Sequence, residues 1–149
     1  MKAYTMILLL CAAWFLHAVS DARAHCEIPC GIYDDELRVK MISEHITTIE
    51  KSMTEIVSLG KQEPVNYNQI VRWVTNKDEH AHMIQDIVSQ YFLTQRITRD
   101  ADKYSEKIST LQKMLVAAMK CKQTTDPNYV EELRSLLKDF EVLYFPKEK

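Results

Sequence analysis

Glycine is nearly absent from this sequence. Only Gly31 and Gly60 occur among 149 residues, and they are widely separated. Phosphate-binding loops, dinucleotide-binding turns and nucleophile elbows all need closely spaced glycines, so these nucleotide-binding and hydrolase sites are excluded. Proline is also scarce, and the four prolines lie where breaks between helices are expected. The lack of chain-breaking residues favours long helices.

No segment is apolar over a length that would span a bilayer. The run from Met6 to Val19 has 14 residues, whereas a membrane-spanning helix needs roughly 20. Lys2 precedes this run and the small-residue site Ala22-Arg23-Ala24 follows it, which is the outline of a secretory signal peptide. An uncleaved anchor is the weaker alternative. We expect cleavage after residue 24, a secreted, periplasmic or lumenal protein that starts at His25, and no stable membrane association.

Basic residues are not in excess. Removing Lys2, Asp21 and Arg23 with the first 24 residues leaves 17 basic and 20 acidic side chains, a net charge of −3 with histidine neutral. Such a chain lacks the excess of basic charge that binds a phosphate backbone, so nucleic acid is not an expected partner. The remaining 125 residues suit a single domain.

Apolar residues at helical spacing, in contrast, are abundant. They predict four helices at about residues 35–59, 66–99, 104–121 and 127–144. Gly60 and Pro64 separate the first two helices, and Asp126-Pro127 provides an N-cap followed by proline at the first position of the fourth. Short connections place successive helices antiparallel. We therefore expect an all-α protein, with an up-down-up-down four-helix bundle over residues 34–149.

The predicted second helix carries a seven-residue apolar repeat, which Lys77 interrupts. We expect the members of this repeat to lie in the core. They are Ile70, Val74, Ala81, Ile84, Val88 and Tyr91.

The predicted start of the mature chain brings several metal ligands together. The α-amine of His25, the amide nitrogen of Cys26 and the Cys26 thiolate would form two fused five-membered rings with a metal. The Cys30 thiolate would complete a plane of two nitrogens and two sulfurs, and the His25 imidazole is left for an axial position. This donor set suits Ni(II) or Cu(II), whereas zinc prefers a tetrahedron.

The cysteines also allow a second interpretation. The mature chain keeps Cys26, Cys30 and Cys121, an odd number with no C-x-x-C pair. An oxidising compartment would favour a disulfide between Cys26 and Cys30 with Cys121 free. The protein would then be a secreted four-helix-bundle binding or signalling protein. The metal content of the mature protein distinguishes the two interpretations.

A di-iron site inside the bundle is a further alternative, because Glu79-x-x-His82 places both side chains on one helical face. Such a site needs a second pair of this kind. No other histidine has a glutamate three residues before it. We expect His45 and His80 to be histidines with satisfied hydrogen bonds and not metal ligands.

The stretch from His25 to Tyr33 reads H-C-x-x-P-C-G-x-Y and matches all six specified positions of a known motif. It resembles the nickel-binding hook of nickel superoxide dismutases. Arg72-Trp73 and Tyr91-Phe92 extend the resemblance more weakly. The resemblance implies a homohexamer of four-helix bundles that disproportionates superoxide to oxygen and hydrogen peroxide, with one nickel per subunit cycling between Ni(II) and Ni(III). A nickel-loading factor is a candidate partner.

The same resemblance implies roles within the hook, residues 25–33. The ligands are the amine and imidazole of His25, the amide and thiolate of Cys26, and the thiolate of Cys30. Tyr33 would lie above the open face of the metal and position superoxide or a water; the alternative for Tyr33 is a packing aromatic. Pro29 lets the chain turn back between the two cysteines, and Gly31 permits a dihedral that other residues resist.

Three positions depart from the family pattern or match it only roughly. Glu27 stands where an aspartate is common, and Met41 stands where a glutamate helps to hold the axial imidazole. Methionine is only a weak hydrogen-bond acceptor, so the orientation of His25 needs another carboxylate. Arg72 roughly matches a family arginine that joins this network and would draw the superoxide anion inward. The alternative for Arg72 is an exposed helix charge.

Overall fold

The computed structural model describes residues 31–145, and within that range the regular structure is entirely helical. The helices run along the chain in the order α2, α3, η1, α4 and α5. Their bounds are Asp35–Leu59, Tyr67–Asp86, Ile87–Arg96, Tyr104–Gln123 and Asn128–Tyr144, respectively.

Helix α2 begins and ends where the sequence predicts. Asp34 caps its N-terminus by accepting a hydrogen bond from the Leu37 amide at 2.9 Å. The negative charges of Asp35 and Glu36 in the first turn interact favourably with the positive end of the helix dipole. At the other end, the amide of Gly60 donates to the Ile56 carbonyl at 3.0 Å.

The predicted helix over residues 66–99 is two segments, which corrects the prediction of one α-helix. Asn66 caps α3 by accepting from the Gln69 amide at 3.2 Å. The chain then continues directly into η1, which is wound as a π-helix and ends at Arg96. Two pairs of adjacent residues in η1 are buried, and periodicity alone does not reveal the wider winding that accommodates them. These pairs are Ile87-Val88 and Tyr91-Phe92.

The start of α5 is shifted by one residue from the prediction. Pro127 occupies the N-cap position and Asn128 is the first helical residue. The Asp126 carboxylate accepts from the Asn128 amide at 3.0 Å, so it forms a turn before the helix. The predicted break between the third and fourth helices is otherwise confirmed.

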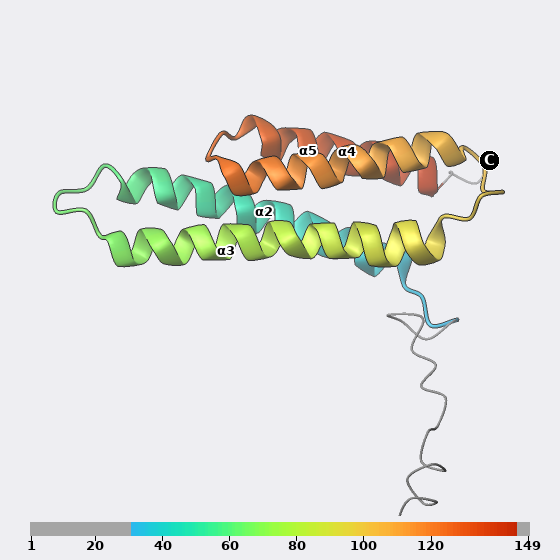
Figure 1. Cartoon of the computed structure of the whole chain (residues 1–149), viewed down its shortest axis with the longest axis horizontal. Coiled ribbons are helices and arrows are strands. Elements are labelled where there is room, and N and C mark those ends of the chain that lie inside the picture. The colour runs from blue at the N-terminus through green and yellow to red at the C-terminus, as the bar shows by residue number, and fades with distance from the viewer. Residues whose placement is uncertain (1–30, 146–149) are drawn as a thin grey trace, which may run out of the picture.

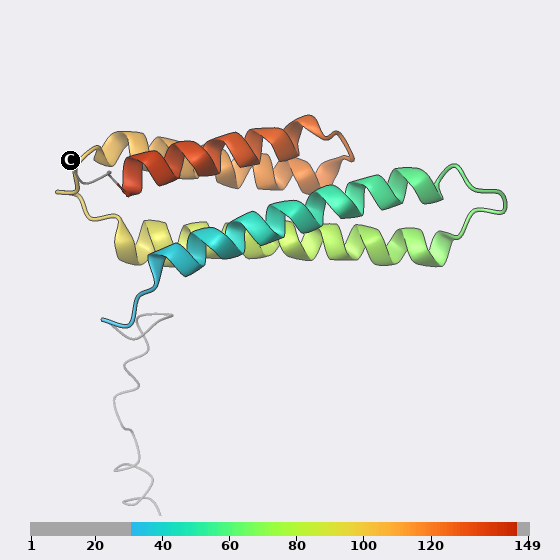
Figure 2. The same ribbon diagram turned by 180° about the vertical axis from the view of Figure 1, so that it is seen from behind.

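The helices form the expected up-down-up-down bundle (Figure 1). Helix α2 packs on α3, α4 packs on α5, and the two hairpins meet through α3 with α4 and α2 with α5. The start of α2, the end of η1 and the end of α5 lie together at one end of the bundle (Figure 2). At the opposite end the α2–α3 hairpin extends beyond the α4–α5 hairpin (Figure 1).

This overhang explains why part of the predicted core is exposed. Val74, predicted to be in the core, is 37% exposed, and Ile70 is only partly buried. The other four members of the repeat are buried, as predicted. Lys77, which interrupts the repeat, is the unexpected residue because it is only 3% exposed. In the described part of the chain, none of the helices has the length and apolar character needed to cross a membrane.

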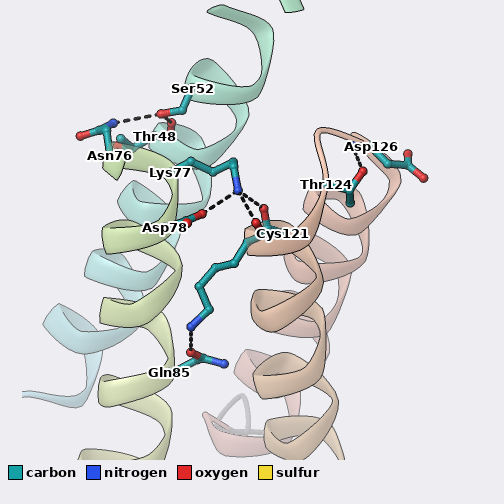
Figure 3. A network of polar contacts seen from close by, with 10 residues as sticks. Thr48, Ser52, Asn76, Lys77, Asp78, Gln85, Cys121, Thr124 and Asp126 are labelled. Carbon is teal, nitrogen blue, oxygen red and sulfur yellow. Dashed lines mark hydrogen bonds and ion pairs between the residues drawn. The ribbon is translucent and has the colours of Figure 1, made fainter. Parts of the chain in front are cut away.

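Lys77 is buried because its ammonium group caps another helix. It donates to the carbonyl of Cys121 at 2.6 Å and to the carbonyl of Lys122 at 2.9 Å, both in the last turn of α4. Asp78 supplies a carboxylate oxygen at 2.7 Å. Figure 3 shows the Lys77 side chain extending from α3 to the end of α4. A cation at a helix C-terminus donates hydrogen bonds to free carbonyls and interacts favourably with the negative end of the helix dipole.

We expect Lys77→Met to lower the free energy of unfolding by about 2–3 kcal/mol, because two carbonyls in the last turn of α4 lose their donor. Urea denaturation followed by circular dichroism measures this loss. Lys113→Met is the matched control, since Lys113 is an exposed lysine of α4, and we expect a change within about 0.5 kcal/mol. Equal losses in the two variants would contradict the capping role.

Candidate metal centre

The described part of the chain begins immediately after the predicted metal ligands. His25, Cys26, Glu27, Pro29 and Cys30 lie outside the described residues. The predicted site residues that the structure does place are Gly31, Tyr33, Met41 and Arg72.

Gly31 has a φ of +91°, in the left-handed region. Side chains rarely tolerate this conformation, although a Cβ at this position would meet no atom within 4 Å. The requirement for glycine here therefore comes from the backbone and not from crowding.

Tyr33 is half-buried against two side chains of η1. Its ring meets Tyr91 edge to face, with centroids 6.0 Å apart and planes at 72°. The Arg96 guanidinium carbon lies 4.4 Å from the Tyr33 ring centroid, close enough for a cation–π interaction. The chain segment that leads from the predicted ligands into α2 is thus held against the bundle by an aromatic ring.

Arg96 and Tyr91 are both held by one carboxylate, Asp35, in the first turn of α2. Arg96 binds it through two bonds, Nε to Oδ1 at 2.8 Å and Nη2 to Oδ2 at 2.7 Å. Tyr91 donates its hydroxyl to Oδ1 at 2.6 Å, and Tyr144, the last residue of α5, donates to Oδ2 at 2.8 Å. We call these four residues the Asp35 cluster.

The charges in the Asp35 cluster depend on one another. Burial alone would raise the pKa of Asp35, but hydrogen bonds from Arg96, Tyr91 and Tyr144 outweigh burial and lower it. Burial and the hydrogen bond to Asp35 raise the pKa of Tyr144 to about 12, and the same two causes raise the pKa of Tyr91. The cluster therefore holds an ionised aspartate, a charged arginine and two neutral phenols at neutral pH.

Met41 lies in the second turn of α2, partly buried against the core. Its sulfur accepts from Arg38 Nη1 at 3.8 Å. The Arg38 guanidinium carbon lies 5.1 Å from the centroid of the Tyr91 ring. Where the family pattern has a glutamate, this chain thus has a thioether beside a cation.

Arg72 does not lie near Tyr33 in the same chain. It is exposed in the second turn of α3, 19 residues before Tyr91. At 1.5 Å per helical residue the two positions are about 28 Å apart along the helix. The structure brings Tyr33 together with Arg96 and with the Tyr91 ring that Arg38 also contacts, and it does not bring Arg72 to them.

His45 of α2 and His80 of α3 are paired with each other. Their Nδ1 atoms are 2.9 Å apart, so one ring donates and the other accepts. This confirms the prediction that both histidines have satisfied hydrogen bonds. Burial and the neighbouring His80 lower the pKa of His45. Residues 31–145 contain no group of three or more His, Cys, Asp or Glu side chains that could hold a metal ion.

Sequence reasoning does not single out the Asp35 cluster. Asp35 looks like an ordinary acidic residue at a helix start, and Arg96 looks like a basic residue in a last turn. Their partners are 56 to 109 positions away along the chain. The one signal in the sequence is an acidic residue two positions after Tyr33, combined with topology that brings the ends of η1 and α5 to the start of α2.

Comparison with known proteins identifies the chain. The sequence profile of the nickel-containing superoxide dismutases matches residues 20–149, most of the chain. The chain therefore belongs to the family of nickel-containing superoxide dismutases. It is an oxidoreductase that uses nickel to disproportionate superoxide. No curated protein and no solved structure matches the chain significantly.

This assignment decides between the two interpretations of the sequence. The alternative, a secreted binding or signalling protein with a Cys26–Cys30 disulfide, has no support from the family match. Of the family's features, the match supports the enzyme, its metal and the helical bundle.

We expect Asp35→Asn to lower the free energy of unfolding at pH 7 by about 2–3 kcal/mol, because hydrogen bonds from Arg96 and two phenols lose their charged acceptor. The pKa of Asp35 is lowered from its ordinary value of 3.8, so its contribution is complete above about pH 5 and is lost as the pH falls through the folded-state pKa. The difference between wild type and variant should therefore shrink between pH 5 and pH 3.

Urea denaturation across that pH range measures the effect of Asp35→Asn. Glu50→Gln is the control, because it removes a more exposed ion pair with Arg134, whose two side chains are 46% and 41% exposed. We expect this control to cost less than about 1 kcal/mol. A difference between Asp35→Asn and wild type that stayed constant with pH would contradict the proposed charge.

Proposed function

We propose that the mature enzyme starts at His25 and that His25, Cys26 and Cys30 of each subunit hold its nickel ion. The observation that carries the proposal is the motif H-C-x-x-P-C-G-x-Y in a chain whose family is nickel-containing superoxide dismutase. Its donors are an amine, a backbone amide, two thiolates and an imidazole, which suit nickel in two oxidation states. Cys121 is a poor alternative ligand, because burial raises its pKa to about 11.

The bound nickel supplies a one-electron couple, Ni(II)/Ni(III), with which two superoxide anions and two protons give one oxygen and one hydrogen peroxide. The thiolates of Cys26 and Cys30, with the deprotonated amide, donate electron density that lowers the potential of the couple. The His25 imidazole favours the oxidised state. The chain thus sets the potential between those of the two half-reactions.

Tyr33 is the residue we assign to substrate positioning. Its ring is held against Tyr91 and Arg96, so it has a defined place just before the start of α2. Superoxide reduction consumes protons, and a phenol or the water that it binds is a suitable donor. Pro29 and Gly31 provide the turns that return the chain between the ligands and into α2, while Glu27 supplies a carboxylate within the hook.

Processing and assembly complete the proposed function. The signal-peptide outline of residues 1–24 supports a secreted, periplasmic or lumenal enzyme without stable membrane association. The family resemblance supports a homohexamer and a nickel-loading factor as a candidate partner. Tyr67 and Val71 lie four residues apart on the overhanging part of α3 and are 73% and 63% exposed, so both side chains are available for a subunit contact.

A variant that keeps one additional alanine before His25 tests the proposal most directly. The added residue turns the ligating amine into a peptide nitrogen, so the chelate ring that uses this amine is lost, and we expect loss of dismutation. Mass spectrometry confirms the N-terminus, and pulse radiolysis measures the rate. Full activity in the extended protein would contradict the assignment of the hook.

We expect Cys26→Ser and Cys30→Ser each to abolish binding of stoichiometric nickel, whereas Cys121→Ser should retain it. Without both thiolates the metal loses its strong donors, while Cys121 lies in the core at the end of α4. Elemental analysis measures the nickel, and circular dichroism should show nearly unchanged helix content for the two hook variants. An empty site in Cys121→Ser alone would show that the ligand set is wrong.

A further inference from the structure

Two arginines lie beside Tyr91 at the end of the bundle where α2 begins, and they differ in their partners. Arg96 makes two bonds to the Asp35 carboxylate, so its charge is neutralised by an adjacent anion. Arg38 contacts the sulfur of Met41 and the face of the Tyr91 ring. Among the residues that the structure describes, Arg38 forms no ion pair with a carboxylate. Arg38 therefore retains its positive charge for other anions.

Arg38 and Tyr33 share a neighbour, the Tyr91 ring. The Arg38 guanidinium carbon is 5.1 Å and the Tyr33 ring centroid 6.0 Å from the centroid of that ring, so the two lie at most about 11 Å apart. The Arg38 side chain is half-buried, so its guanidinium is held in place but still reaches solvent. An anion approaching Tyr33 from solvent therefore passes within the range of this cation at low ionic strength, since the Debye length is about 30 Å at 0.01 M.

We propose that Arg38 attracts the superoxide anion toward Tyr33. This inference rests on the proposed function of the hook. The mature chain has a net charge of −3, which repels an anionic substrate, so a local cation has a direct effect on its approach. Asp34 and Glu36 in the same turn oppose Arg38, and Lys40 of the next turn offsets one of them. Arg38 would thus attract superoxide, the role that the family resemblance implied for Arg72.

The test compares the second-order rate of superoxide consumption, per bound nickel, for Arg38→Gln, Arg38→Lys and wild type. We expect Arg38→Gln to be about two- to fivefold slower at about 10 mM ionic strength, and the difference to vanish near 1 M, because salt screens the attraction. Arg38→Lys keeps the charge and should retain most of the rate. Lys61→Gln, which removes the same charge from the exposed loop at the opposite end, should match wild type.

A second measurement does not depend on nickel or on turnover. Titration of the mature chain with nitrite, a small monovalent anion, should shift the NMR signal of the Arg38 side-chain Nε–H and of the backbone amides next to Tyr33. The backbone shifts should be lost in Arg38→Gln and kept in Lys61→Gln.

The inference is overturned if Arg38→Gln has the same rate and salt dependence as wild type, or if Arg72→Gln shows the loss in its place. A salt-independent loss in Arg38→Gln that Arg38→Lys does not rescue would also overturn it, because packing and not charge would then be responsible. If the wild-type protein bound no nickel or did not dismutate superoxide, the proposed function itself would be refuted. Failure of the Arg38 inference and failure of the proposed function are therefore distinguishable.

Discussion

The hydrogen bonds to the Asp35 carboxylate are the interactions on which the end of the bundle where α2 begins depends. This carboxylate accepts four hydrogen bonds from η1 and α5, and it stands in the first turn of α2, two residues after Tyr33. Without it a partly buried guanidinium and two phenols would lack their acceptor, which costs more than the bonds themselves contribute. The carboxylate also fixes the direction in which the chain enters α2. The segment that joins the hook to the bundle is therefore anchored where α2, η1 and α5 meet.

Lys77 likewise joins separate helices, at the contact between α3 and the end of α4. Its ammonium group links α3 to the last turn of α4 (Figure 3), and Gln85 adds bonds to the Leu115 carbonyl and the Lys122 side chain. An ammonium group that must reach two carbonyls of another helix restricts the register of the two helices, in addition to the packing of their apolar faces. Asp35 and Lys77 thus define how the helices are aligned, and the apolar core supplies the burial that stabilises them.

Much of this architecture is predictable from local signals, and the rest is not. The bounds of α2, the antiparallel bundle and the metal-binding motif follow from spacing, caps and residue chemistry. The core prediction is wrong for Val74. Periodicity shows which face of a helix is apolar, but it does not show that the α2–α3 hairpin extends beyond the α4–α5 hairpin that covers the rest of this face. The roles of Lys77 and Asp35 depend on carbonyls and phenols more than forty positions away, and residue order alone does not identify such pairs. The hook motif is recognisable from residue order alone, because consecutive donors are a local pattern.

The π-helical winding of η1 has a consequence for how this segment can vary. Adjacent residues in it serve two sides of the molecule: Tyr91 reaches Asp35 and Tyr33, while Phe92 packs on Phe140 at 4.9 Å between centroids. Losing one residue from 87–96 at unchanged winding would turn every later side chain of the segment to another face, because each residue of a helix rotates the chain by a fixed angle, about 100° in an α-helix and less in the wider π-helix. The segment can therefore exchange apolar side chains of similar size, but its length cannot change. Gaps in this stretch should be rarer among functional relatives than substitutions.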